Sequence, residues 1–303
     1  MGNRSMIQYL ILMLKGMAMG AADVVPGVSG GTIAFISGIY EQLIDNISNI
    51  SINSFKIWFE KGFKTFWTQI NGTFFLYLFL GIGISVFSLA KFVSYLLVEF
   101  PILVWSFFFG LIISSVWLIF KVIEKWSLTL FFMTAVGAAF AYYLTRVDTI
   151  GFIDSEWYII LSGAIAICAM ILPGISGAFI LIILGTYDKV LNAIGDKNFL
   201  IISLFAFGCL FGLFSFARLL KYLFSNFKSY TIAVLMGFMI GSLNKVWPWK
   251  ETIIKSKEEI IQYNILPSDF AGESYILSAS LLFLLGFFVI IIFDRFSPNH
   301  IKK

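Results

Sequence analysis

The chain has 303 residues, of which 59% are hydrophobic and only 13% are charged, with a formal net charge of +4 at pH 7. Soluble domains carry about 25% charged residues. This composition, with a mean hydropathy of +0.93, excludes a soluble globular protein and indicates an integral membrane protein. Neither Cys168 nor Cys209 belongs to a CxxC motif or has ligand residues beside it, so the sequence predicts no disulfide, no metal site and no cofactor.

Eight apolar segments follow one another along the chain. In order, they cover residues 7–40, 74–97, 102–120, 128–145, 157–185, 199–224, 230–246 and 275–293. The first begins like a signal peptide, but Lys15 interrupts it and a second apolar stretch follows without a loop, so we expect it to be retained. The segments therefore predict a multi-pass domain built from helices.

The first and fifth segments contain the same motif. Residues 26–40 return as residues 173–187 at a constant offset of 147, and eight of the fifteen positions are identical. A Pro-Gly pair ends a helix, because proline lacks a backbone donor and glycine adopts positive φ. We therefore predict helix breaks at Pro26-Gly27 and at Pro173-Gly174. The alternative is a pair of kinked helices whose glycines only allow close packing.

Each predicted break is followed by small residues and by hydroxyls suited to capping a new helix. Lipid cannot satisfy the amides at the start of that helix, so the break must be buried in protein or line a watery cavity. A helix N-terminus carries partial positive charge and free N–H donors, which favour an anion and above all a phosphate. The candidate residues for binding this anion are Ser29, Gly30, Gly31, Thr32, Ser176 and Gly177.

Several charged residues are predicted at or near membrane depth. Asp23, just before the first break, is a candidate carrier of a coupling proton; the alternatives are an ion pair with Lys15 or a cap on the broken helix. Glu41, which flanks the other end of the motif, is a further candidate for coupling or for an ion pair. Lys91 and Arg218 occupy equivalent positions in two later segments. Each either neutralises an anionic head group or extends to the nearest interface.

The repeat extends beyond the motif. Residues 81–115 align with residues 208–242 at an offset of 127, with ten of 35 positions identical. The smaller offset means that the first half has about 20 extra residues, in the loop at 45–73. The chain therefore divides into two repeats, residues 1–150 and 151–303, each with one motif segment and three further segments.

The distribution of basic residues distinguishes two topologies. If the motif segments are re-entrant hairpins, each repeat crosses three times, the repeats are inverted, and 13 basic residues lie on the side of the N-terminus against 8 opposite. If all eight segments cross, the repeats are parallel and the division is 10 to 11. The positive-inside rule favours inversion with both termini cytoplasmic. The predicted fold is an all-α integral membrane protein of two inverted repeats, each a re-entrant broken-helix hairpin plus three transmembrane helices.

In its motifs the chain resembles the polyprenyl-phosphate transporter family. The resemblance rests on Lys15-Gly16, on Gly-Ala-Ala-Asp at residues 20–23 and on residues 26–41, and it covers essentially the whole chain. It implies a flippase in the plasma membrane that returns undecaprenyl phosphate, the lipid carrier of cell-wall synthesis. Its partners would be this lipid and the bilayer, with no nucleic acid and with no oligomeric state indicated. Arg218 and Lys91 would neutralise the phosphate held by the motifs.

The chain has no GxxxxGK[ST] sequence, so ATP is not expected as the direct energy source. Coupling to protons or to the membrane potential is the remaining expectation.

Two other functions stay open at this point. One is a membrane-embedded polyprenyl-pyrophosphate phosphatase, a family that also uses duplicated small-residue motifs. Its chemistry needs glutamates and a histidine close to those motifs, whereas here only Asp23 and Glu41 flank the first copy and no histidine is near either. The other is a small-anion exchanger or channel, which the broken-helix argument fits equally well.

Overall fold

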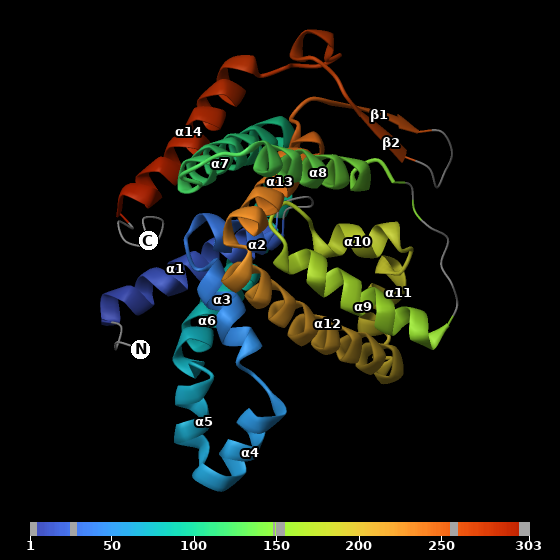
Figure 1. The fold of residues 1–303 in the computed structure, drawn as a ribbon. Helices are drawn as coiled ribbons and strands as arrows, with labels where there is room; N and C mark the ends of the chain where they lie inside the picture. The colour runs from blue at the N-terminus through green and yellow to red at the C-terminus, as the bar shows by residue number, and fades with distance from the viewer. Residues whose placement is uncertain (1–4, 25–28, 148, 150–154, 255–259, 297–303) are drawn as a thin grey trace.

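The structure is a computed structural model that describes residues 5–24, 29–147, 149, 155–254 and 260–296. Most of the described residues are helical (Figure 1). The first half contains α1 (Met6–Asp23), α2 (Gly30–Ile36), α3 (Tyr40–Ser48), α4 (Ile52–Lys61), α5 (Phe63–Gln69), α6 (Gly72–Glu99), α7 (Pro101–Val122) and α8 (Leu128–Leu144). The second half contains α9 (Glu156–Ile171), α10 (Gly177–Ile183), α11 (Tyr187–Gly195), α12 (Phe199–Asn226), α13 (Lys228–Val246), β1 (Lys250–Ile254), β2 (Ile260–Asn264), the 3₁₀ turn η1 (Pro267–Asp269) and α14 (Ile276–Phe296).

Several of the described helices have the length and apolar composition of membrane-spanning helices. Helices α6, α7, α12 and α13 are long and apolar enough to cross a bilayer, and α10 with α11 passes the same test as a pair bent by 109°. Helices α8 and α9 and the residues 276–292 of α14 are apolar but shorter. This set of helices confirms the predicted class, a mainly helical multi-pass membrane protein.

Helix bounds recur in the two halves at the offsets seen in the sequence. Helices α2 and α10 each have seven residues and begin 147 positions apart, and the nine-residue helices α3 and α11 keep the same offset. Helices α6 and α12 each have 28 residues and begin 127 positions apart. Similar sequence thus folds to helices of equal length in both halves, while the inverted relation of the repeats stays a prediction.

Helix α2 folds back along α1. The Gly30 amide, at the start of α2, donates to Asp23 Oδ1 at the end of α1 (2.6 Å). Lys15 Nζ, two turns earlier in α1, donates to the carbonyl oxygen of Ser37, just after α2 (2.5 Å). The two helices therefore run in opposite directions and form a hairpin.

Helix α10 folds back along α9 in the same way. Gly177, at the start of α10, lies against the Ala166 carbonyl near the end of α9. The Tyr158 hydroxyl, near the start of α9, donates to the carbonyl oxygen of Leu184, just after α10 (2.9 Å). A helix of seven residues is about 10 Å long, and the apolar core of a bilayer is about 30 Å thick. Neither α2 nor α10 is therefore long enough to cross a bilayer by itself.

Glycines lie where helices of the same half cross, so that backbone meets backbone. A Cβ atom on Gly81 of α6 would overlap the Met13 carbonyl of α1, and a Cβ on Gly208 of α12 would overlap the Ile160 carbonyl of α9. Small residues let membrane helices approach closely, which is the main source of their packing energy in lipid. Each hairpin is thus attached to the first long helix that follows it.

The last helix of each half packs against the other half. Gly110 of α7 faces the Phe283 carbonyl of α14, and Gly237 of α13 faces the Thr134 carbonyl of α8. Figure 1 shows α14 alongside α7 and α8 alongside α13. The two halves therefore exchange their final helices.

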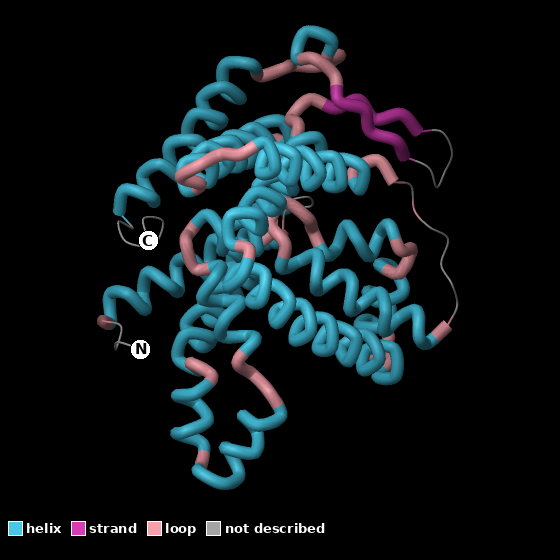
Figure 2. Tube along the Cα trace, in the orientation of Figure 1, coloured by secondary structure: helices cyan, strands magenta, loops and turns pink. Residues whose placement is uncertain are grey.

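Two long connections contain regular structure. Helices α4 and α5 occupy the 45–73 loop and form the lowest part of the molecule in Figure 1, where Trp58 stacks on Phe59 and Phe66. Between α13 and α14, β1 and β2 pair antiparallel, with Lys250 opposite Asn264 (Figure 2, magenta). This two-stranded hairpin departs from the all-α prediction; both strands contain adjacent isoleucines, which favour extended structure.

Candidate functional site

The two motifs meet, and side chains of the first bond to the backbone of the second motif and of the end of α9 just before it. Ser29 Oγ donates to the Met170 carbonyl oxygen at 2.9 Å, and the Gly174 amide donates to Thr32 Oγ1 at 2.9 Å. Ser29 and Thr32 are each only 1% exposed. A Cβ atom on Gly31, between them, would overlap the backbone of Met170. We call these five residues the motif junction; it joins segments about 140 residues apart in sequence.

Charged side chains of α1 bond to both ends of α2. Asp23 accepts from Gly30 at the N-terminus of α2, and Lys15 donates to Ser37 at its C-terminus. A carboxylate at the first position and an ammonium at the second are both favourable in the field of the helix dipole. The bond from the Gly30 amide gives Asp23 one of the roles considered for it, the cap on the broken helix.

The second motif has a different arrangement at the start of its short helix. Met170 stands where Asp23 stands in the first motif, and Ser176 makes no side-chain cap bond to α10. Gly174 has a φ of +84°, which favours glycine, and it packs against the backbone of Phe238 in α13. The second motif is therefore held by α13 and by the first motif.

Of the two predicted helix breaks, only the second lies within the described residues. Helix α9 ends at Ile171 and α10 begins at Gly177, so Pro173 and Gly174 lie between two helices. Pro26 and Gly27, the predicted first break, lie outside the described residues.

The cations expected at the anion site are placed elsewhere. Arg218 Nη2 donates to the Ile50 carbonyl oxygen at 3.4 Å, beyond the end of α3, and Lys91 is exposed on α6. Glu41 forms an ion pair with Lys228 at 2.9 Å. Among the described contacts, none links Arg218 or Lys91 to the motif junction.

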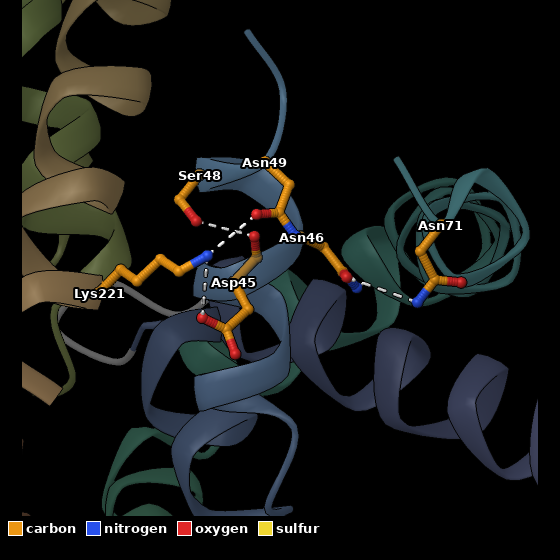
Figure 3. Close-up of polar contacts among 6 residues, drawn as sticks. All are labelled: Asp45, Asn46, Ser48, Asn49, Asn71 and Lys221. Carbon is orange, nitrogen blue, oxygen red and sulfur yellow. Dashed lines mark hydrogen bonds and ion pairs between the residues drawn. The ribbon is translucent and has the colours of Figure 1, made fainter. Parts of the chain in front are cut away.

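A polar cluster that sequence reasoning missed attaches α3 to its neighbours (Figure 3). Lys221 of α12 donates to Asn49 Oδ1 at 2.9 Å and lies 3.7 Å from Asp45 Oδ1. Asn71, just before α6, donates to Asn46 Oδ1 at 3.4 Å. The signal available in the sequence was the run of Asp, Asn and Ser at residues 45–49, directly after the first motif. The Lys221 contacts attach the end of α3 to the second half, and the Asn71 contact attaches it to the start of α6.

Replacing Thr32 with valine is expected to lower the free energy of unfolding by about 1–3 kcal/mol. Valine keeps the shape of threonine but leaves the Gly174 amide without its acceptor in a buried place. Thermal unfolding of the purified protein in detergent measures the change. Thr134→Val is the control, because the Thr134 hydroxyl donates to Leu130 within its own helix and its removal leaves no amide unpaired. Equal destabilisation by both substitutions would contradict a special role for the junction.

Comparison with known proteins identifies the family. A family profile described as "Undecaprenyl phosphate translocase-like" matches residues 19–262, a stretch that includes both motifs. The polyprenyl-phosphate transporter of Vibrio cholerae serotype O1 is 46% identical over 270 residues, covering 87% of this chain and 88% of the relative. The polyprenyl-phosphate transporter of Staphylococcus aureus is 34% identical over 264 residues, covering 80% and 88%. No solved structure matches the chain. The chain therefore belongs to the undecaprenyl phosphate translocase-like family, as the resemblance in its motifs predicted.

Proposed function

We propose that this protein moves a polyprenyl phosphate, the carrier undecaprenyl phosphate, across the plasma membrane so that the carrier is reused in cell-envelope synthesis. The observation that carries the proposal is the 46% identity to the Vibrio cholerae polyprenyl-phosphate transporter over 87% of the chain. The chemistry agrees with it, because the anionic head group needs a polar path through protein while the prenyl tail can stay in lipid.

The motif junction supports a role as the closed gate of this path. In the present conformation the Ser29 hydroxyl is bonded to the end of α9 and the Thr32 hydroxyl to the second motif, and the Gly30 amide is bonded to Asp23. A path between the two motifs opens only when these bonds break. We expect the released groups, with Ser176 and Gly177 of the second motif, to bind the phosphate oxygens as the head group passes.

The proposed orientation places both termini in the cytoplasm. Helix α1 begins and α14 ends on the left of the molecule in Figure 1, and the hairpin of β1 and β2 lies on the opposite side. With the excess of basic residues on the side of the N-terminus, the positive-inside rule gives this orientation. The hairpin then belongs to the outer face.

We assign proton coupling to Asp23. Its carboxylate holds the start of α2 next to the motif junction, and protonation weakens its bond to the Gly30 amide. Proton binding would thus loosen the first motif at the point where the gate opens.

A vesicle assay tests the transport proposal. Undecaprenyl phosphate is incorporated into both leaflets of sealed vesicles, and a phosphatase that cannot enter them is added outside. Vesicles with the protein are expected to lose nearly all of the lipid phosphate, because the inner pool reaches the outer leaflet. Protein-free vesicles should stop at about half, the share of a single leaflet. A plateau at the same level with and without the protein would contradict the proposal.

The alternative functions have their own readouts. If the purified protein releases inorganic phosphate from undecaprenyl pyrophosphate, its function is that of a phosphatase and the transport proposal is wrong. The two carboxylates that flank the first motif do not favour that chemistry, since Asp23 caps α2 and Glu41 is paired with Lys228. If vesicles with the protein take up inorganic phosphate without movement of the lipid, its function is that of a small-anion exchanger.

A further inference from the structure

A polar cavity with three cationic side chains lies beside the second motif. It is lined by Arg146, Lys245 and Lys250 and by the amides of Asn244, Gln262 and Asn264. These residues come from the turn after α8, the last turn of α13 and the two strands. We call it the basic cavity. None of its members was among the candidate site residues of the sequence.

Each of the three cations of the basic cavity lies over an aromatic ring, and the three rings belong to three helices. The distances to the ring centroids are 4.8 Å for Lys245 and Phe179 of α10, 4.7 Å for Lys250 and Trp105 of α7, and 5.5 Å for Arg146 and Tyr142 of α8. Such contacts attract and orient a cation but leave its charge in place. These contacts therefore position the three positive charges and do not themselves neutralise them.

No carboxylate lines the cavity among the residues that the structure describes. Lys250 Nζ donates to the Lys245 carbonyl oxygen at 2.6 Å. Burial, and then the charge of Lys245, lower the pKa of Lys250 to about 8. Glu251, next along the strand, is exposed. Lys245 and Lys250 are partly buried, whereas Arg146 is exposed. Partly buried cations are unfavourable without a counter-charge, and no described residue lining the cavity supplies one, so the cavity is suited to an anion supplied from outside.

The basic cavity adjoins the motif junction through α13 and α10. Gly174 of the junction packs against Phe238, about 10 Å along α13 from Lys245. Lys245 itself lies over Phe179, in the first turn of α10. An anion in the cavity is thus next to the second motif and, in the proposed orientation, at the outer end of the path.

We propose that the basic cavity binds the phosphate group of a phosphomonoester, with Arg146, Lys245 and Lys250 as its cationic ligands. A phosphomonoester carries nearly two negative charges at pH 7 and three oxygens, which suit one guanidinium that binds two oxygens and two ammonium groups. Resting on the proposed function, the ligand is the head group of polyprenyl phosphate waiting outside the gate. Free inorganic phosphate has the same chemistry, and the test separates the two.

The test measures binding by thermal shift of the full chain in detergent micelles, with undecaprenyl phosphate, undecaprenol and inorganic phosphate as separate probes. The variants are Arg146→Gln, Lys245→Gln and Lys250→Gln, and Lys64→Gln on the exposed surface of α5 is the matched charge control. Each cavity variant is expected to weaken binding of undecaprenyl phosphate about tenfold, with undecaprenol inert. Without ligand, the cavity variants should melt at or above the wild-type temperature, because repulsion between the cations is relieved.

The outcomes separate the two proposals. A response to undecaprenyl phosphate alone, lost in the cavity variants, supports the lipid head group as ligand. A response to inorganic phosphate with the same loss supports the cavity and assigns it to the free anion. Equal binding by the cavity variants and Lys64→Gln overturns the cavity and leaves transport standing. Absence of binding in the wild type overturns the cavity, and the vesicle assay then decides transport independently.

Discussion

Replacement of Asp23 by asparagine is expected to reduce transport of undecaprenyl phosphate to nearly the rate of protein-free vesicles and to remove its dependence on pH. Asparagine keeps an oxygen that can accept from the Gly30 amide, so the hairpin of α1 and α2 should stay folded. What it loses is the charge and the exchangeable proton of the carboxyl group. The measurement is the vesicle assay over a range of pH, with and without a pH gradient.

Two further variants separate coupling from folding at this position. Asp23→Ala removes the acceptor altogether and is expected to cost about 1–3 kcal/mol of stability, because the buried Gly30 amide is left unpaired. Asp45→Asn removes a half-exposed carboxylate that lies near Lys221, and transport by this variant should keep the pH dependence of the wild type. Unchanged pH dependence in Asp23→Asn would exclude Asp23 as the proton carrier.

Replacement of Gly81 by alanine is expected to destabilise the protein by about 2 kcal/mol or more, through a single methyl group. That methyl would overlap the Met13 carbonyl, so α1 and α6 would have to move apart along their crossing. Separation costs packing that lipid tails do not replace. Because α1 holds both ends of α2 in the first motif, transport should fall together with stability. The measurement is thermal unfolding beside the vesicle assay.

Gly83, two residues further along the same helix, is the matched control. A Cβ atom there meets no atom within 4 Å. Gly83→Ala should therefore be neutral or stabilising by up to about 1 kcal/mol, the difference in helix propensity between glycine and alanine. If both alanines had the same effect, the crossing of α1 and α6 would not be the contact that matters.

The local structure of this fold could be predicted from the sequence, and the duplicated motif was the clearest signal. Pro173-Gly174 lies between α9 and α10, as the helix-break prediction required. The apolar composition of the other segments identified them as helices. Helix starts are encoded locally, by residues such as Ser29 that cap the helix directly after them. The family could also be identified from the sequence, because the residues of its motif are contiguous.

The partners of the polar side chains could not be predicted in the same way. Ser29 and Thr32 looked available to a ligand, yet each bonds to backbone more than 140 residues away. Arg218 and Lys91 are equivalent in the repeat, but the environment of Arg218 is set by α3, which docks on α12 of the other half. The basic cavity depends on four separate parts of the chain, and in the sequence Asn244 and Lys245 look only like the polar end of an apolar segment. Tertiary contacts decide these features, and no local pattern records them.

The exchange of the final helices bears on how such a chain could have arisen. Helix α7 has its glycine crossing with α14, and α8 has its crossing with α13, so each half supplies a surface that only the other half covers. A chain of one half alone would expose both surfaces and would be complete only after pairing with a second copy of itself. Two copies of one half would interlock in this way as a homodimer, and the duplicated sequence has the form that joining two such copies into one polypeptide would give. The two copies now differ, and only the first has an aspartate before its Pro-Gly pair.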